Sequence, residues 1–145
     1  MTVIAIDGTF ASGKGTLARQ LASHYRLKYL DTGKLYRAVA HQVLEMDGDL
    51  DDAESCAEIA KRLDPAVLSA PILKSGPVGA AASRVAVHPP VRAALLDYQR
   101  RFAAGGAVLD GRDIGSVICP DADIKFYITA DVTIRAQRRH RDLAL

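Results

Sequence analysis

The sequence has little of what marks secreted, membrane or nucleic-acid-binding proteins. Only two of its 145 residues are cysteines, Cys56 and Cys119, and they form no CxxC pair, so packing thiols in a reduced compartment are predicted. No apolar run approaches the length of a membrane span, and Asp7 interrupts the first one, which also argues against a signal peptide. The net charge of +2 is too small to indicate nucleic acid. We expect a cytoplasmic protein with neither a membrane nor a nucleic-acid partner.

Strand-like and helix-like runs alternate along the chain, and there is no internal repeat. The runs that read as strands are residues 3–7, 28–30, 107–109 and 124–129. Helices are expected over residues 14–24, 35–45, 51–63 and 78–87, in a long segment from Pro89, and in a basic segment at about 131–141. Prolines and glycines predict an irregular loop over residues 64–79. The alternation predicts the α/β class, with a three-layer parallel sheet.

A glycine-rich stretch, "GTFASGKGTLA", separates the first strand from the first helix. Gly8, Gly13 and Lys14 meet the G-x-x-x-x-G-K pattern in the context that the pattern needs. Glycines let backbone N–H groups turn toward one anion, the helix start adds its dipole, and Lys14 adds a full charge. Gly15 and Thr16 then give the Gly-Lys-Gly-Thr version of nucleotide kinases, whereas the Asn-Lys-x-Asp motif of GTPases is absent from the sequence. The pattern predicts a nucleoside triphosphate site; the alternative is a glycine-rich turn without a ligand.

The stretch "YLDTGKLYRAVA" carries the second signal, at the end of the second strand. Thr32 could cap the helix that follows. Arg37 falls near the start of that helix, where a cation is unfavourable unless an anion such as a phosphate pairs with it. The alternative is a surface arginine that pairs with a carboxylate.

The stretch "VLDGRDIGSV" carries the third signal. Asp110 ends a buried strand at the sheet edge where ligands bind, and it could order Mg²⁺ or its waters. Arg112 and Asp113 follow in a glycine-flanked loop, and a surface pair between them is the alternative. In a fourth stretch, "AASRVAVHPPVRAAL", Ser83 and Arg92 flank a turn stiffened by proline, and each alone reads as an ordinary surface residue.

Together these stretches resemble the bacterial cytidylate kinases, a branch of the nucleoside-monophosphate kinase family of P-loop proteins. The similarity runs over about residues 2–141 and rests most on "DTGKLYR" and "GRDIG". It implies phosphoryl transfer from ATP to CMP or dCMP with Mg²⁺, in pyrimidine metabolism, by a monomer. It also implies a P-loop core at residues 1–31 and 105–145 and a helical acceptor-binding domain at residues 32–104.

The resemblance assigns roles residue by residue. Catalysis would use Lys14, Arg37, Asp110 and Arg112. ATP would be bound by Gly8, Thr9, Phe10, Ala11, Ser12, Gly13, Lys14, Gly15, Thr16, Arg138 and Arg139. CMP would be bound by Thr32, Tyr36, Arg37, Ser83, Arg92, Arg112 and Asp113. No direct metal ligand is implied, although Thr16 and Asp110 could reach Mg²⁺ through water.

The chain departs from the family pattern in two places. Residues 64–79 are too few for the small β-sheet insert of many cytidylate kinases. The sequence also stops before the lid and the last edge strand, which leaves residues 124–129 as an open edge with Lys125 as its guard. We therefore expect a C-terminally incomplete chain that is poorly active alone. The alternatives are a non-catalytic nucleotide-binding fragment, or a kinase for another small acceptor.

Overall fold

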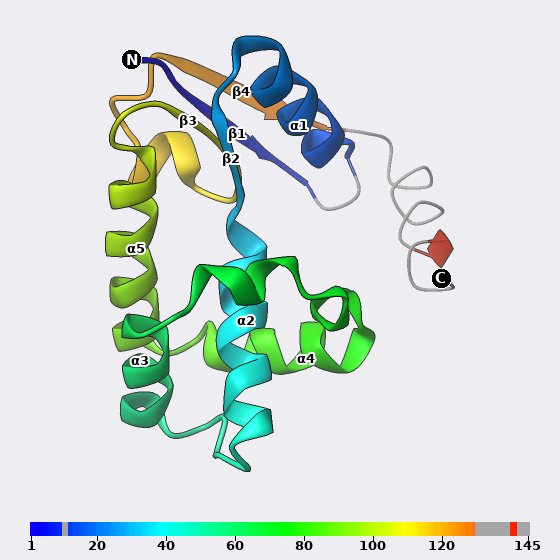
Figure 1. Cartoon of the computed structure of the whole chain (residues 1–145), viewed down its shortest axis with the longest axis vertical. Helices are drawn as coiled ribbons and strands as arrows, with labels where there is room; N and C mark the ends of the chain where they lie inside the picture. The colour runs from blue at the N-terminus through cyan, green and yellow to red at the C-terminus, as the bar shows by residue number, and fades with distance from the viewer. Residues whose placement is uncertain (10–11, 130–139, 142–145) are drawn as a thin grey trace. The chain divides into compact units, whose positions relative to one another are not determined.

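The chain folds into two compact units. Figure 1 presents the computed structural model, which describes residues 1–9, 12–129 and 140–141. One unit comprises Met1–Thr32 and Gln99–Leu145, and the other comprises Gly33–Tyr98. The first unit holds a parallel sheet and the second is helical, so the predicted α/β class is confirmed.

The sheet of the first unit has four parallel strands in the order β2-β3-β1-β4. Their bounds are β1 Val3–Gly8, β2 Lys28–Asp31, β3 Ala107–Gly111 and β4 Ile124–Ile128. All four predicted strands are confirmed, each within two residues at its end. In the register, Asp110 lies beside Ile6 of β1 and Asp31 of β2. The carboxyl ends of β1, β2 and β3 therefore meet at one edge, where ligands bind in open parallel sheets.

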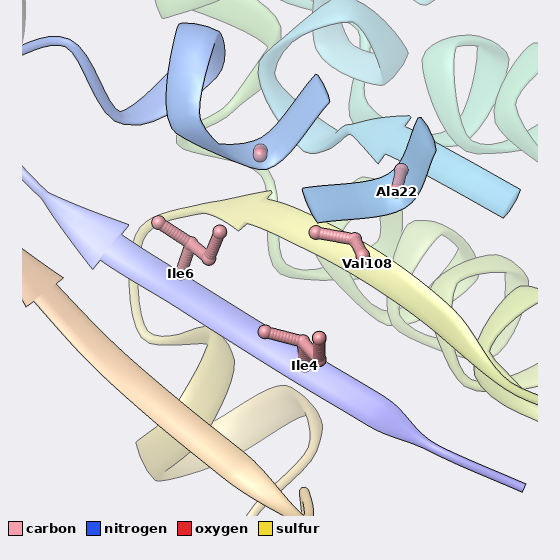
Figure 2. Packing of buried hydrophobic residues seen from close by; sticks show 5 residues of the cluster. Ile4, Ile6, Ala22 and Val108 are labelled. Carbon is pink, nitrogen blue, oxygen red and sulfur yellow. The ribbon is translucent and has the colours of Figure 1, made fainter. Parts of the chain in front are cut away.

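The core of this unit lies between the sheet and α1 (Lys14–Tyr25). Ile4, Ile6 and Val108 pack against Ala22 and are all at most 5% exposed (Figure 2). Ala5, which points to the other face of β1, is fully buried too. Burial on both faces is typical of a central parallel strand. Leu17 and Leu21 of α1 pack against the same cluster, so the apolar face of this helix covers the sheet.

After β3 the chain passes through Arg112 and Asp113 into a short π-helix, η3 (Ile114–Ile118), whose first residue is buried. The next strand, β4, forms the edge of the sheet in the described part of the chain. Phe126 and Tyr127 on it are 38% and 70% exposed.

The second unit is built from helices. Most of α2 (Thr32–Glu45) and α5 (Pro89–Ala103) belongs to it, with α3 (Ala53–Lys61) and α4 (Gly76–Val85) between them. Its fully buried side chains recur at helical spacing, at Leu35, Val39, Val43, Val85, Val91 and Leu95. The helices predicted for this part of the chain are confirmed. Asp52 begins α3 as its N-cap, with the Ser55 amide at 3.2 Å.

The prediction of an irregular loop over residues 64–79 is wrong. Two short 3₁₀ helices, η1 (Pro65–Ser69) and η2 (Pro71–Lys74), fill most of it, and α4 begins at Gly76. Proline stands in the first turn of each element, where its missing N–H costs nothing. Asp64 and Ser75 cap η1 and α4 by accepting from Ala66 N at 2.9 Å and Val78 N at 3.3 Å. Prolines therefore start helices here, two of them behind a capping side chain.

Both cysteines are free thiols, and Cys56 is buried in α3. In the part of the chain that the structure describes, every helix is too short or too polar to cross a bilayer. The basic helix predicted over residues 131–141 falls almost wholly outside the described residues.

Candidate functional site

The loop between β1 and α1 presents backbone donors at the carboxyl edge of the sheet. Gly13 has a φ of 94°, a left-handed conformation that glycine adopts without strain. The helix begins at once with Lys14, with no acidic residue in its first turn and no side-chain cap from the described residues. Its first N–H groups and positive dipole end are therefore available to an anion.

Two hydroxyl groups in this loop fit the same anion. The Thr9 and Ser12 side-chain oxygens are buried and have no hydrogen-bond partner among the described residues. A buried hydroxyl without a partner costs about 1–3 kcal/mol. A phosphate oxygen would accept from either one, so the loop suits a phosphate group. The predicted ATP residues Phe10 and Ala11 lie outside the described residues.

Gly8 lies so close to the neighbouring strand that there is no space for a side chain. A Cβ atom there would lie 2.2 Å from the backbone oxygen of Ile128 on β4. We expect Gly8→Ala to lower the free energy of unfolding by about 1–3 kcal/mol, because a backbone carbonyl must move. Urea denaturation measures this change in the free energy of unfolding. The matched control, Gly79→Ala on α4, has no atom within 4 Å of the new Cβ and should stabilise by about 0.5–1 kcal/mol. Equal effects of the two changes would contradict this account.

Asp110 contacts Tyr29, Lys14 and Thr32. Its carboxylate accepts a hydrogen bond from the Tyr29 hydroxyl, and its other oxygen lies 4.0 Å from Lys14 Nζ. Its backbone oxygen accepts from Thr32 Oγ1 at 3.0 Å. The Thr32 hydroxyl is therefore engaged with β3, and its capping role stays a prediction. The three contacts fix the strand-end carboxylate beside the lysine of the loop.

The electrostatics of this group reflect its burial. Burial raises the pKa of Asp110, and the Tyr29 hydrogen bond and the Lys14 charge only partly offset this. Burial, followed by the hydrogen bond to Asp110, raises the pKa of Tyr29 well above its ordinary range, so the phenol keeps its proton and remains a donor.

The raised pKa of Asp110 predicts how stability varies with pH. The folded state holds this proton more tightly than the unfolded chain, so stability falls as pH rises from the ordinary value of 3.8 through the raised pKa. Asp110→Asn removes the buried charge and should raise the Tm of the ligand-free protein at pH 8, with the gain fading toward pH 4. Thermal denaturation at both pH values measures this, with the exposed Asp121→Asn as control. A lower Tm for Asp110→Asn at pH 8 would contradict the assignment.

The predicted magnesium residues offer hard oxygen donors near the loop. Thr16 Oγ1 accepts from Arg19 Nη2 at 3.5 Å, and Asp110 supplies the carboxylate. Among the described residues there is no group of three or more His, Cys, Asp or Glu side chains that could hold a metal. One carboxylate with a hydroxyl fits Mg²⁺, which is usually held by one or two carboxylates together with substrate phosphates and waters.

An open cavity of about 660 Å³ brings the loop and the "GRDIG" stretch together. It is lined by Asp7, Gly8, Thr9, Arg112, Asp113, Gly115, Ser116, Lys125, Phe126 and Tyr127. Arg112 and Asp113 are both exposed, and no ion pair of the described residues joins them, so the surface-pair alternative is wrong. Two groups of opposite charge therefore face solvent beside the start of the phosphate loop.

The predicted CMP residues of the second unit are Tyr36, Arg37, Ser83 and Arg92, whereas Thr32 belongs to the first unit. Tyr36 lies near enough to Arg92 for that charge to lower the Tyr36 pKa, although burial raises it more. Arg92 Nη1 donates to the carbonyls of Ala86 and Val87 at 3.0 and 3.1 Å. Ser83 Oγ donates to the carbonyl one turn earlier at 3.4 Å. Arg37 is half-buried on α2.

Sequence reasoning missed Tyr29 and Arg19 as members of the site. Tyr29 is two residues before Asp31, and its register partner is Val108, two residues before Asp110. Side chains two apart share a face of a strand, so Tyr29 and Asp110 point the same way from neighbouring strands. This alternation of side chains predicts the contact between Tyr29 and Asp110 only when the register of the two strands is known.

Comparison with known proteins matches most of this chain to one enzyme family. The family model described as cytidylate kinase matches residues 4–145. The cytidylate kinase of Rhodopseudomonas palustris (strain ATCC BAA-98 / CGA009) is 58% identical over 139 residues, which cover 94% of this chain and 66% of that protein. That of Bradyrhizobium sp. (strain ORS 278) is 58% identical with the same coverage. That of Methylobacterium sp. (strain 4-46) is 59% identical over 97% of this chain and 68% of that protein. The chain thus spans about two thirds of the length of these relatives.

Proposed function

Because the chain belongs to the cytidylate kinase family, we propose that it transfers the γ-phosphoryl group of ATP to CMP or dCMP, giving ADP and CDP or dCDP. The observation that carries this proposal is the shared cavity, in which Gly8 and Thr9 of the phosphate loop lie beside Arg112 and Asp113. One loop would bind ATP and the other would bind CMP at the same sheet edge. This arrangement suits transfer of a phosphoryl group from one nucleotide to the other.

The ATP side consists of the loop and the start of α1. Backbone N–H groups of residues 8–16, with the Thr9 and Ser12 hydroxyls, would hold the phosphates. Lys14 would leave Asp110 for the β- and γ-phosphates, which carry more charge than one carboxylate. Arg138 and Arg139 would hold ATP from the other side, and both lie outside the described residues.

The chemistry needs positioning and charge neutralisation more than a general base. A phosphate oxygen of CMP attacks the γ-phosphorus, and the bond from that phosphorus to the β–γ bridging oxygen breaks as ADP leaves. Lys14 and Arg112 would stabilise the charge that develops on the transferred group. Bound Mg²⁺ would neutralise phosphate charge, held by ATP with Thr16 and Asp110 reached through water.

The acceptor side would use the residues that the family resemblance assigns to CMP. Arg37 and Arg112 would hold the phosphate of CMP, because a guanidinium makes two parallel bonds to it. Asp113 would accept from the cytosine amino group, while Ser83 and Arg92 would serve the ring N3 and O2 acceptors. Thr32 and Tyr36 would line the same pocket. Both observed bonds of Arg92 use Nη1, so its other nitrogens would meet the base.

The two compact units would divide this work. The sheet unit would carry ATP and the catalytic lysine, and the unit Gly33–Tyr98 would carry most of the acceptor contacts. Exclusion of water from the bound nucleotides would prevent hydrolysis of ATP. A monomeric state and a cytoplasmic location stay predictions.

An acceptor panel tests the proposal. ADP release is followed with CMP, dCMP, UMP, AMP and shikimate as acceptors, and binding of ATP is measured in parallel. We expect CMP and dCMP to exceed the others by at least about 100-fold, because unpaired buried polar groups reject the wrong acceptor. Binding of ATP without release of ADP by any acceptor would favour a binding module. Release with UMP, AMP or shikimate above CMP would favour a different kinase.

A further inference from the structure

We propose that Asp7 is a positioning residue that holds the loop of Arg112 and Asp113 in its acceptor-binding form. This inference rests on the proposed function, because it takes Arg112 and Asp113 as acceptor contacts. Asp7 is not one of the residues that the motifs assign to either nucleotide.

The Asp7 carboxylate is joined to the start of η3 by two short bonds. Its Oδ1 accepts from the backbone N–H of Ile114 at 2.8 Å, and its Oδ2 accepts from that of Gly115 at 2.9 Å. Bonds to an ionised acceptor are roughly twice as strong as neutral ones. Because Ile6 faces α1, Asp7 points to the opposite face of β1, the one that meets η3.

These bonds replace the cap that η3 would otherwise take from its own sequence. Asp113 stands at the N-cap position, where an aspartate usually accepts from the first free amides of the helix. Its side chain makes no capping bond, and its φ of 56° is left-handed. Since Asp7 already satisfies those amides, the Asp113 carboxylate is not needed as a cap and stays exposed on the cavity.

The same residue ties the two halves of the site together. Asp7 directly precedes Gly8 at the start of the phosphate loop and pairs in register with Gly111, next to Arg112. The acceptor loop is therefore fixed relative to the residue from which the phosphate loop starts.

The test compares Asp7→Asn with a matched control, Asp123→Asn. The Asp123 carboxylate accepts from Val3 N at 2.8 Å at the other end of β1, so it anchors the same strand away from the cavity. In Asp7→Asn, amide hydrogen exchange of Ile114 and Gly115 should speed up at least about 10-fold, and CMP affinity should fall about 10-fold. ATP affinity should stay within about twofold. Asp123→Asn should change neither nucleotide's affinity.

Unchanged CMP affinity in Asp7→Asn, an equal loss for ATP, or an equal CMP loss in Asp123→Asn would overturn the inference, since each points to a structural role alone. If the unmodified protein binds no CMP, the proposed function fails, and the exchange rates alone then decide whether Asp7 anchors the loop. If Asp7→Asn does not fold, exchange in the unmodified protein decides. Slow exchange at Ile114 and Gly115 supports the anchor, and exchange at the unprotected rate overturns it.

Discussion

Replacing Lys14 by alanine is expected to reduce phosphoryl transfer at least about 100-fold with every acceptor, because a preorganised charge on the transferring group is lost. Lys14, the first residue of α1, has its Nζ 4.0 Å from the buried carboxylate of Asp110. The change removes the one full charge of the loop while the backbone donors remain. ATP should therefore still bind, but more weakly, and transfer should fall much further than binding.

Lys61→Ala is the control for this variant. Lys61 lies on the exposed face of α3, 3.3 Å from Glu58, in a surface pair of the kind that contributes little. ADP release and ATP binding should both be unchanged in it. Transfer by Lys14→Ala within threefold of the unmodified rate would show that the loop does not act on the reacting phosphate.

The second large effect concerns the choice of base. Asp113→Asn is expected to reduce the preference for CMP over UMP about 10- to 100-fold, the range that one charge-assisted hydrogen bond supplies. Cytosine presents an amino donor where uracil presents a carbonyl, so a carboxylate suits only the first. An asparagine amide can donate to the carbonyl of uracil as well as accept from cytosine.

The backbone conformation of Asp113 suits an asparagine, so the substitution should change the side chain alone. Asp113 has a left-handed φ of 56°, which asparagine tolerates as readily as aspartate, so the fold should not change. Asp121→Asn, in the exposed turn before β4, is the control and should keep full discrimination. The ratio of kcat/KM for CMP to that for UMP is the measurement. Full discrimination in Asp113→Asn would remove Asp113 from base recognition.

Local sequence patterns predict most of the secondary structure of the chain. The four strands, the glycine loop and the helices with regular apolar spacing each follow from residues close together in sequence. The strand-end position of Asp110 also follows from nearby residues, because Asp110 comes directly after an apolar run. The short helices at residues 65–74 do not follow from the sequence pattern, because prolines in the first turn of a helix look the same as prolines in a loop.

The contacts that organise the site depend on the register of distant strands. Tyr29 reaches Asp110 across 81 positions of sequence, and Asp7 reaches Ile114 across 107. The motifs assign no role to Tyr29 or Asp7, and each matters because the parallel pairing of the strands places it beside its partner. Arg92 shows the same limit, because its bonds to Ala86 and Val87 arise from the turn geometry between α4 and α5.

The most direct test of the central claim is a two-step titration followed by backbone amide NMR. ATP added first should shift the amide signals of residues 8–16. CMP added next should shift those of Arg112 and Asp113. The account predicts both sets of shifts in that order, with Lys14→Ala weakening the first. Saturating ATP that leaves the loop signals unmoved, or CMP that leaves Arg112 and Asp113 unmoved, would contradict it.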